Sequence, residues 1–560
     1  MLVAIALGLV AARPANAQGR TEYMVPMDDG TELATDVYRF ILDPFDYPVV
    51  LIRTPYGKDT SEMQTLAYFL LNAGYVAVVQ DERGTGHSQG TNELFRADGW
   101  GTLHDGYDTV KWIAKRSWCD GNVGMFGLSA LGISAYLAAG ARPPALKCEV
   151  VAFSAADLYD QAAYQGGELR AELIDSWVGA QNPTKLQEIL DHEVRTSYWD
   201  ILDAEDREPT ITIPTLHIGG WYDCFLQGTL NHFAGLQARG ATGARNNQKL
   251  IVGPWTHVNF NSRTQGELTY PSNSTLSLSD LNDETKNWFD YWLAHKGTLS
   301  GPRVHYYVMG EVGQTTTRGN QWRDSDTWPP ATQPQRLFLW AGGELWGQAA
   351  RGRGVEPESY VYDPRNPVPT RGGANLDIDA GPYDQRPVEA RNDVLVYTSQ
   401  RLTQPLEVTG RITVELYASS TARDTDWTAK LCDVYPDGRS MLVCDGVLKA
   451  RCRDSVSSPT LINRRTIYRY QIDLWSTSIE FNTGHRIRLT ISSSNSPRFE
   501  PNANDGRNVR SGFPPSVAVN TIYHDAVRPS AIVLPVSWPT APHPVFGSTR
   551  TDAGKWPLYR

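Results

Sequence analysis

A serine flanked by glycines is the first candidate for chemistry in this chain. Ser129 follows the apolar run 123–127, which is typical of a short strand, and precedes residues 131–139, which have helical spacing. Gly127 and Gly132 allow a tight turn with the serine hydroxyl at its apex, as in a nucleophile elbow. Leu131 stands where the commoner elbow has a glycine, so the motif alone is equally compatible with an ordinary strand-to-helix turn.

A serine hydroxyl needs a histidine base, and that histidine needs a carboxylate to hold its tautomer and stabilise its cation. In parallel-sheet hydrolases these residues follow separate strands in the chain order serine, acid, histidine. Asp223 follows the apolar run 215–220, and His257 follows the run 249–255. Either residue alone could be structural, the first in a turn and the second as a hydrogen-bonded side chain. Their joint order and placement favour a triad of Ser129, Asp223 and His257.

The oxyanion of a tetrahedral intermediate needs two hydrogen-bond donors. The backbone N–H of Ala130 is one candidate, because this residue follows the nucleophile at the start of a helix. Tyr56, in the turn after the run 47–53, is the candidate for the second donor. The sequence leaves open whether this tyrosine instead packs its ring in the turn.

Strands that alternate with helices must position these residues. The expected strands are 47–53, 75–80, 123–127, 147–154, 215–220 and 249–255, and the expected helices are 62–72, 103–118, 131–139, 228–239 and 281–296. This alternation predicts a mostly parallel sheet covered on both faces, with ligands at the carboxyl ends of its strands.

Two other regions depart from this alternation. Residues 156–210 contain helical stretches and no expected strand, which predicts a helical cap over the carboxyl edge of the sheet. The catalytic domain is therefore expected over residues 19–155 and 211–300. Beyond it, short alternating runs and turn-rich segments predict an antiparallel β-sandwich of jelly-roll type over residues 301–560, entered through the polar linker 310–335.

The N-terminus has the features of an export signal. Residues 2–12 are apolar but too few to span a bilayer, and Ala15-Asn-Ala17 is a small-residue cleavage pattern. We therefore expect residues 1–18 to be a signal peptide and the protein to be secreted or periplasmic. A formal net charge of -10 and a pI near 5.6 argue against nucleic acid or an anionic membrane surface as partner.

The 6 cysteines are too few for a disulfide framework in a chain of 560 residues. Cys432 and Cys444 lie on either side of the turn Asp437-Gly-Arg439, so they could face each other across a hairpin. The sequence leaves open whether they form a disulfide or remain free thiols. The spacing of cysteines and histidines does not match a metal site, and we expect no cofactor.

Several motifs surround the candidate residues. In the first half they are Arg53-Thr-Pro-Tyr56, Gln80-Asp-Glu-Arg-Gly84, Trp118-Cys-Asp-Gly-Asn-Val-Gly-Met-Phe-Gly-Leu-Ser129, Gly219-Gly-Trp-Tyr-Asp223 and Gly253-Pro-Trp-Thr-His257. In the second half they are Asp384-Gln-Arg-Pro387, Asp424-Thr-Asp-Trp-Thr-Ala-Lys430 and Gly484-His-Arg-Ile-Arg-Leu489. From about residue 20 to 540 the chain resembles the CocE/NonD-type α/β-hydrolases, the family of cocaine esterase, α-amino-acid ester hydrolases and X-prolyl dipeptidyl peptidases.

This resemblance implies an α/β-hydrolase core, a helical cap and a C-terminal jelly roll. It also implies Ser129, Asp223 and His257 as the triad, with the Tyr56 hydroxyl and the Ala130 amide as the oxyanion hole. Members of the family are often oligomers, so a homo-oligomer remains open.

Two departures from the family pattern concern the acyl pocket. The family usually has tyrosine after the nucleophile, where this chain has Ala130, and an aromatic residue of the cap aligns near Ala163. Phe225 and Trp177 are the remaining candidates for substrate-binding aromatics, although Trp177 could equally be a core residue.

The leading hypothesis is a secreted serine hydrolase that cleaves small-molecule carboxylic esters through an acyl-enzyme intermediate. The alternative is an X-prolyl dipeptidyl-peptidase-like or α-amino-acid ester/β-lactam acylase activity on amides. That alternative needs carboxylates to hold a substrate amine, and the nearby candidates are Asp157, Asp160 and Glu168. A non-catalytic glycan-binding protein that uses the jelly roll is a third hypothesis.

Overall fold

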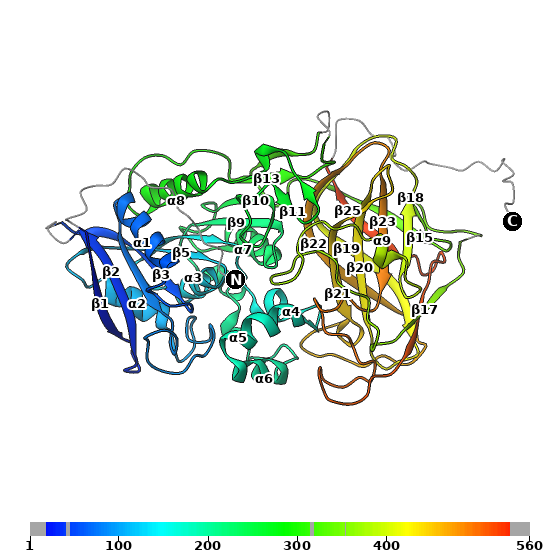
Figure 1. The fold of residues 1–560 in the computed structure, drawn as a ribbon, viewed down its shortest axis with the longest axis horizontal. Helices are drawn as coiled ribbons and strands as arrows, with labels where there is room; N and C mark the ends of the chain where they lie inside the picture. The colour runs from blue at the N-terminus through cyan, green and yellow to red at the C-terminus, as the bar shows by residue number, and fades with distance from the viewer. Residues whose placement is uncertain (1–17, 41–44, 314–317, 353, 538–560) are drawn as a thin grey trace.

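The computed structural model describes residues 18–40, 45–313, 318–352 and 354–537. Two β-rich units lie side by side along the long axis, the first built from the N-terminal half and the second from the C-terminal half (Figure 1). The expected signal peptide lies outside the described residues, apart from its last position. Within the described ranges, no helix is both long and apolar enough to cross a membrane.

The first unit contains a ten-stranded sheet in the order β1-β2-β4-β3-β5-β6-β9-β10-β13-β14. Its strands are β1 (Gln18–Pro26), β2 (Glu32–Phe40), β3 (Tyr47–Thr54), β4 (Val76–Asp81), β5 (Cys119–Leu128), β6 (Leu146–Ala152), β9 (Thr215–Tyr222), β10 (Lys249–Thr256), β13 (Val304–Val308) and β14 (Gln321–Ser325). The strands from β4 to β13 pair in parallel, and β1, β2 and β14 add antiparallel edges. Every residue of β4, β9 and β10 is buried, as expected for central strands covered on both faces.

Helices cover both faces of this sheet, and their bounds are α1 (Ser61–Ala73), α2 (Asp105–Ile113), α3 (Ala130–Ala141), α7 (Leu226–Arg239) and α8 (Leu278–Trp292). A Cβ on Gly124 of β5 would lie 2.9 Å from the Phe289 ring of α8. A Cβ on Gly127 would lie 2.3 Å from the carbonyl oxygen of Leu131 in α3. Because residues three apart on a strand point to opposite faces, α8 and α3 pack on opposite sides of β5. The predicted α/β alternation is confirmed.

The first two strands after the predicted boundary at residue 301 join the first sheet. The strand expected at 303–309 is β13, which pairs in parallel with β10 of the first sheet rather than with the β-sandwich. The expected linker 310–335 contains β14, which pairs with β13. The first sheet therefore extends to Ser325, because a short alternating strand fits either sheet and its pairing partner alone decides which.

The cap lies between β6 and β9 and is irregular. Its elements are η2 (Tyr159–Ala163), β7 (Tyr164–Gln165), β8 (Glu168–Leu169), α4 (Ala171–Leu173), η3 (Ile174–Val178), α5 (Gly179–Gln181), α6 (Pro183–Asp191), η4 (Asp200–Leu202) and η5 (Glu205–Thr210). The prediction that the cap lacks strands is wrong at the β7–β8 hairpin. Gly166 and Gly167 turn this hairpin with φ 55 and φ 79. A Cβ on Gly166 would lie 2.2 Å from the carbonyl oxygen of Val447, so the turn packs directly on the second unit.

The second unit is the predicted antiparallel β-sandwich, with one parallel pair between β16 and β18. Its strands are β15 (Gln333–Trp340), β16 (Glu344–Trp346), β17 (Glu358–Tyr362), β18 (Leu395–Ser399), β19 (Leu406–Ser420), β20 (Asp426–Val434), β21 (Ser440–Lys449), β22 (Tyr468–Phe481), β23 (Arg486–Ser492), β24 (Ala518–Ile522) and β25 (Ala531–Val536). The smaller elements are the strands β11 (Thr264–Gln265) and β12 (Leu268–Thr269), the helix α9 (Arg386–Glu389), and the helical turns η6 (Ser272–Ser274) and η7 (Ala450–Cys452).

The expected hairpin around the turn at 437–439 is formed by β20 and β21. Leu431 lies opposite Cys444 and Cys432 lies opposite Leu442, so the two cysteines are offset along the ladder. Both are buried free thiols in this structure.

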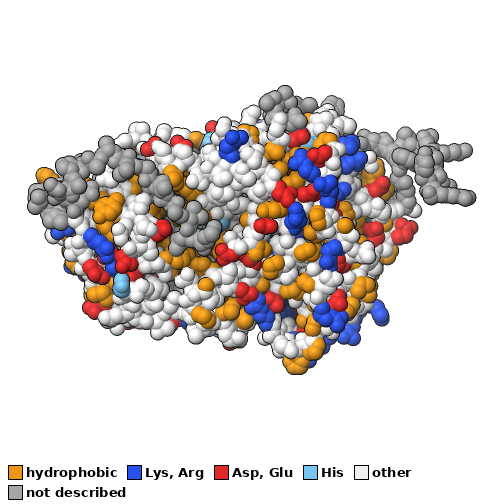
Figure 2. All heavy atoms as spheres, in the orientation of Figure 1, with side chains coloured by type: hydrophobic (Ala, Val, Ile, Leu, Met, Phe, Trp, Pro, Cys, Tyr) orange, Lys and Arg blue, Asp and Glu red, His pale blue; other side chains and the backbone are white. Residues whose placement is uncertain are grey.

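One apolar core runs across the boundary between the units. Trp221 and Leu226 of the first unit belong to one buried cluster with two residues of the second unit, Val443 on β21 and Leu474 on β22. The loop after β9 is therefore held between both units. On the face seen in Figure 2, charged side chains of both signs gather mainly over the second unit.

Candidate active site

Ser129 lies at a sharp turn between β5 and α3. Its backbone has φ 59 and ψ -124, a region that residues other than glycine rarely adopt. Its N–H donates to Ala152 of β6 at 2.9 Å, and its carbonyl oxygen accepts from Gly132 at 2.9 Å. A Cβ on Gly132 would lie 2.8 Å from Val151, so glycine is needed here for the close approach of α3 to the sheet. Gly132 thus supplies the close contact even though Leu131 interrupts the usual motif.

The three predicted triad residues meet at the carboxyl ends of β5, β9 and β10. The Ser129 hydroxyl lies 2.8 Å from Nε2 of His257. Nδ1 of His257 lies 2.6 Å from Oδ1 of Asp223, and the Asp223 side chain is fully buried. With the Nδ1 proton donated to the carboxylate, Nε2 is left to accept the serine proton. This arrangement can generate a serine nucleophile.

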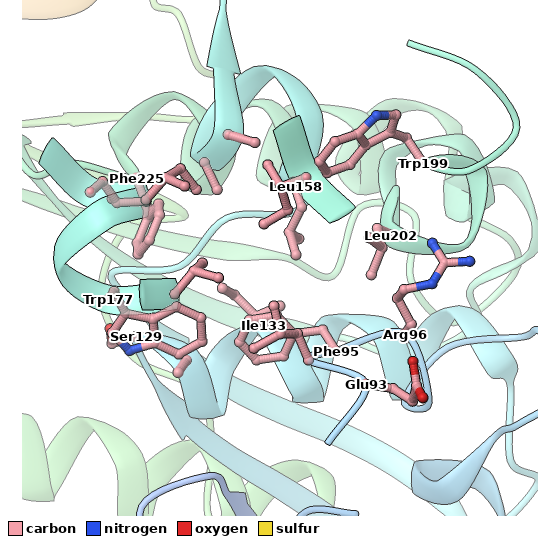
Figure 3. A pocket seen from close by; sticks show the side chains of 18 of the residues that line it. Glu93, Phe95, Arg96, Ser129, Ile133, Leu158, Trp177, Trp199, Leu202 and Phe225 are labelled. Carbon is pink, nitrogen blue, oxygen red and sulfur yellow. The ribbon is translucent and has the colours of Figure 1, made fainter. Parts of the chain in front are cut away.

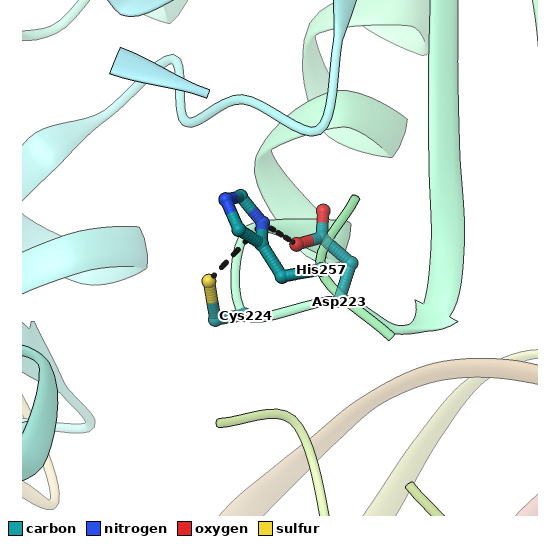
Figure 4. A group of neighbouring side chains, drawn as sticks. All are labelled: Asp223, Cys224 and His257. Carbon is teal, nitrogen blue, oxygen red and sulfur yellow. Dashed lines mark hydrogen bonds and ion pairs between the residues drawn. The ribbon is translucent and has the colours of Figure 1, made fainter. Parts of the chain in front are cut away.

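Cys224 is a third neighbour of the imidazole, with its sulfur 3.6 Å from Nδ1 (Figure 4). Burial, and secondly the Asp223 carboxylate, raise the pKa of this thiol well above its usual range. Asp223, Cys224 and His257 are types that could ligate a metal, and their ligand atoms lie within 4.8 Å of one another. Since Nδ1 is engaged by the carboxylate and the thiol stays protonated, we interpret the group as the support of the histidine base.

Of the two predicted oxyanion donors, Ala130 follows Ser129 directly, and Tyr56 lines the same space as Ser129. Ala130 is the first residue of α3, where backbone N–H groups have no partner within the helix. The Tyr56 oxygen accepts a hydrogen bond from Nε1 of Trp177 at 2.9 Å, which leaves its own proton available to donate. Burial raises the pKa of Tyr56 to about 12, so it remains a neutral donor at physiological pH.

Buried polar contacts behind the elbow link its supporting strands to α3. Arg53, fully buried on β3, is paired with Asp98 and donates to Gln80 at 2.9 Å. Glu82, just after β4, accepts from the Ser134 hydroxyl of α3, one turn beyond Ala130. The sequence singled out Arg53 and Glu82 as parts of motifs, and only the structure shows their contact partners.

Ser129 lies at one end of an apolar pocket, while Glu93 and Arg96 lie at the other end (Figure 3). The side chains between them are mostly apolar and come largely from the cap: Phe95, Ile133, Leu158, Ala162, Ala163, Leu173, Ile174, Trp177, Trp199, Leu202 and Phe225. The predicted residues Trp177 and Phe225 both line it. The Phe95 and Trp177 rings stack at 5.5 Å, and the Phe225 ring lies edge-on to His257 at the same centroid distance, 5.5 Å. We call this space the apolar pocket.

A wider space opens on the other side of Ser129, and we call it the open cleft. It is lined by Tyr56, His257, Trp177 and Glu62 from the first unit. Residues 376–378 of the second unit complete it, and Leu376 also reaches the apolar pocket. Sequence reasoning missed this segment, because it lies far along the chain in a stretch that carries no recognisable motif.

The three carboxylates proposed to hold a substrate amine do not line either space. Glu168 is buried and paired with Lys449 of the second unit at 3.1 Å. Asp157 accepts from the Tyr159 backbone at 2.9 Å, and both Asp157 and Asp160 line a separate cavity. The expectation that they face the substrate is therefore wrong, because the chain of the cap turns their side chains away from Ser129.

A parallel sheet with a strained serine elbow and a histidine held between that serine and a buried aspartate defines a serine hydrolase with the α/β-hydrolase fold. Residues 29–185 and 177–259 match the X-Pro dipeptidyl-peptidase model of the S15 family, and residues 297–533 match the C-terminal non-catalytic domain of X-Pro dipeptidyl-peptidases. The cocaine esterase of Rhodococcus sp. (strain MB1 Bresler) is 34% identical over 586 residues, covering 92% of this chain and 97% of that protein. The chain belongs to this family of cocaine esterase and X-Pro dipeptidyl-peptidases.

Solved structures agree with this assignment. An α-amino acid ester hydrolase superposes with a TM-score of 0.79 at 25% identity, covering 96% of this chain and 100% of that chain. An aminopeptidase from the marine sediment archaeon Thaumarchaeota archaeon has the same fold, with a TM-score of 0.80 at 23% identity over 93% of this chain and 97% of that chain. The family includes esterases and peptidases, so its membership establishes a serine hydrolase and leaves the substrate to the site.

Proposed function

We propose that this protein is a secreted carboxylic ester hydrolase that works through an acyl-enzyme intermediate on Ser129. The observation that carries the proposal is the continuous relay from Ser129 through His257 to Asp223, at 2.8 Å and 2.6 Å. It lies where an apolar pocket and an open cleft meet. An ester linkage placed at this junction has its carbonyl carbon within reach of the serine oxygen.

In the first half-reaction His257 takes the Ser129 proton as the serine oxygen attacks the ester carbonyl. The Ala130 N–H and the Tyr56 hydroxyl stabilise the oxyanion. The imidazolium, held by Asp223, then protonates the departing alcohol and leaves an ester between the acyl group and Ser129. In the second half-reaction His257 activates water, which releases the acid and restores the serine.

The lining of the two spaces supports a proposal for where the acyl and alcohol parts of the substrate bind. His257 lines the open cleft and not the apolar pocket, so the alcohol that it protonates belongs in the cleft. The acyl group then occupies the apolar pocket, whose lining suits an uncharged hydrocarbon chain or ring. We therefore expect esters of apolar acids to be the better substrates.

The test is turnover of p-nitrophenyl esters by Ser129→Ala, with Ser61→Ala on the exposed start of α1 as the matched control. The active-site variant should lose hydrolysis and labelling by a fluorophosphonate, while its thermal unfolding and that of the control match the wild type. Retained hydrolysis by Ser129→Ala would overturn the assignment of the nucleophile.

Peptidase or acylase activity is the weaker alternative, because the carboxylates that would hold a substrate amine face away from Ser129. Acidic side chains that do line the two spaces include Glu93, which is paired with Lys185 at 2.6 Å, and Glu62 and Asp377 in the cleft. Faster cleavage of an X-Pro amide than of the matched ester would reverse this ranking. We do not retain the glycan-binding hypothesis, since a protein without catalysis has no need of an assembled relay.

The proposal of export depends on the N-terminal sequence. Ala15-Asn-Ala17 precedes Gln18, and the first strand, β1, begins at that residue. Expression of the full chain in a bacterial host, followed by N-terminal sequencing of the periplasmic protein, should identify Gln18 as the first residue. An uncleaved protein confined to the cytoplasm would contradict the proposal.

A further inference from the structure

A second cavity lies behind the wall of the apolar pocket. Leu158, Ala162 and Ala163 of the cap face the apolar pocket, whereas Asp157, Asp160, Gln161 and Gln165 of the same segment line the other cavity. Its volume is about 190 Å³, and the second unit closes it with residues of β19, β21 and β22. We call it the acidic cavity.

Four carboxylates line the acidic cavity against a single guanidinium. The carboxylates are those of Asp157, Asp160, Glu205 and Asp473, and the guanidinium is that of Arg411. Two of the carboxylates have cationic partners. Arg411 forms an ion pair with Asp473 at 2.5 Å, and Arg195 forms one with Asp157 at 4.0 Å. Among the described residues, neither Asp160 nor Glu205 has an ion-pair partner, so neither carboxyl group has a cation to stabilise its ionised form.

Ionisation of these two groups is costly, because a partly buried carboxylate without a cation loses hydration and gains no pairing. Burial raises the pKa of Glu205 to about 8, and the nearby Asp157 carboxylate adds to the shift. Burial likewise raises the pKa of Asp160 to about 6. A bound cation would stabilise the ionised carboxylates and lower both pKa values.

An unpartnered amide points to a ligand independently of the charges. Gln165 lines the acidic cavity and is only 3% exposed, yet neither its Nε2 nor its Oε1 has a hydrogen-bond partner in the described part of the chain. A buried amide without hydrogen-bond partners is destabilising, because it has lost its bonds to water and gained none in the protein. By contrast, both polar atoms of the Gln161 side chain have partners, since its oxygen accepts from two backbone N–H groups and its nitrogen donates to Glu205.

We propose that the acidic cavity is a binding site for a small alkylammonium ligand, held by Asp160, Glu205 and the amide oxygen of Gln165. An ammonium group has three donors and no acceptor, which suits a lining of carboxylate and amide oxygens. A metal ion fits less well, because among the described residues no three carboxylates of this cavity bring ligand atoms within 4.8 Å of one another. The exposed side chains of Arg411 and Gln471 mark the opening to solvent.

This site is separate from the substrate site, since its lining includes none of the triad or oxyanion residues. Its occupant would nevertheless touch the reverse side of the segment that forms the acyl wall. An amine at this position therefore acts as an effector of the pocket and not as a substrate.

The experiment is isothermal titration of the full-length Ser129→Ala protein with 1,4-diaminobutane, with 1,4-butanediol and calcium chloride as parallel titrants. Because this protein is inactive by design, the result does not depend on the proposed esterase activity. We expect the diamine to bind with one-to-one stoichiometry and the diol not to bind. Binding of the diol with equal affinity, binding of calcium alone, or no binding of any titrant would overturn the proposal.

Variants of the lining locate the site. Asp160→Asn and Glu205→Gln should each weaken diamine binding about tenfold or more, because each removes a charge-assisted hydrogen bond. The matched control is Asp206→Asn, a side chain 69% exposed beside Glu205 that does not line the cavity. Gln165→Leu, which leaves all charges in place, provides a further variant if one of the others fails to fold. Unchanged affinity in the folded lining variants would also overturn the proposal.

Discussion

The two spaces that meet at Ser129 differ in volume, polarity and origin. The apolar pocket has a volume of about 60 Å³ and is built mainly by the cap, whereas the open cleft has about 540 Å³ and includes residues 376–378 of the second unit. His257, the proposed general acid, lines the open cleft and not the apolar pocket. With the acyl group in the pocket and the alcohol in the cleft, as we propose, one nucleophile can select narrowly among acyl groups and accept many alcohols, because separate parts of the fold form the two spaces.

The largest loss of activity is expected at Asp223, which acts through His257 whichever acyl group or alcohol is bound. Asp223→Asn should lower kcat by about 10⁴-fold, because the amide stabilises the wrong tautomer of His257 and cannot balance its charge. The loss should be the same for acetyl and hexanoyl esters and for small and bulky alcohols, as measured by steady-state kinetics. With Asp206→Asn as the control, a loss that varies widely between esters would break the distinction between shared chemistry and separate recognition.

A smaller but still general effect is expected for the oxyanion donor. Tyr56→Phe should lower kcat by about 10²-fold with little change in KM, because the lost hydrogen bond strengthens only as the oxyanion forms. Tyr68→Phe, at an exposed position of α1, is the matched control. A change confined to KM would instead assign Tyr56 to binding in the open cleft.

The next variant tests the apolar pocket alone. Ala163→Phe should lower kcat/KM for p-nitrophenyl hexanoate about tenfold relative to p-nitrophenyl acetate, because the new ring occupies the space of the longer acyl chain. Varying the alcohol at a fixed acetyl group provides the control and should show no such dependence. If the two acyl lengths are affected alike, the acyl group does not bind where we place it.

The smallest effect is expected in the open cleft. Asp377→Asn should lower kcat/KM for esters of cationic alcohols about two- to fivefold, because it removes an exposed carboxylate from the wall, and added salt should shrink the difference. Neutral alcohols and the neighbouring control Asp379→Asn should show little change. An equal effect on neutral esters would mean that the segment 376–378 shapes the cleft but does not discriminate between cationic and neutral alcohols.

Much of the site could be predicted from local sequence. Ser129, Asp223 and His257 each follow an apolar run, and the ends of parallel strands converge at one edge of a sheet, so chain order alone placed them together. The β-sandwich was also predictable from its alternating runs. The assignment of β13 and β14 was not, because alternation describes a strand and does not name its neighbour.

The sequence by itself determined the chemistry of this protein: the nucleophile, its base and the glycines that permit the elbow are local features. Only the tertiary structure decided what surrounds that chemistry. Asp160 and Glu168 have the residue type that an amine-binding substrate site would need, yet the turns of the cap direct them to the acidic cavity and to Lys449. Which way a side chain faces depends on contacts between segments far apart in the chain, and no short stretch of sequence contains them.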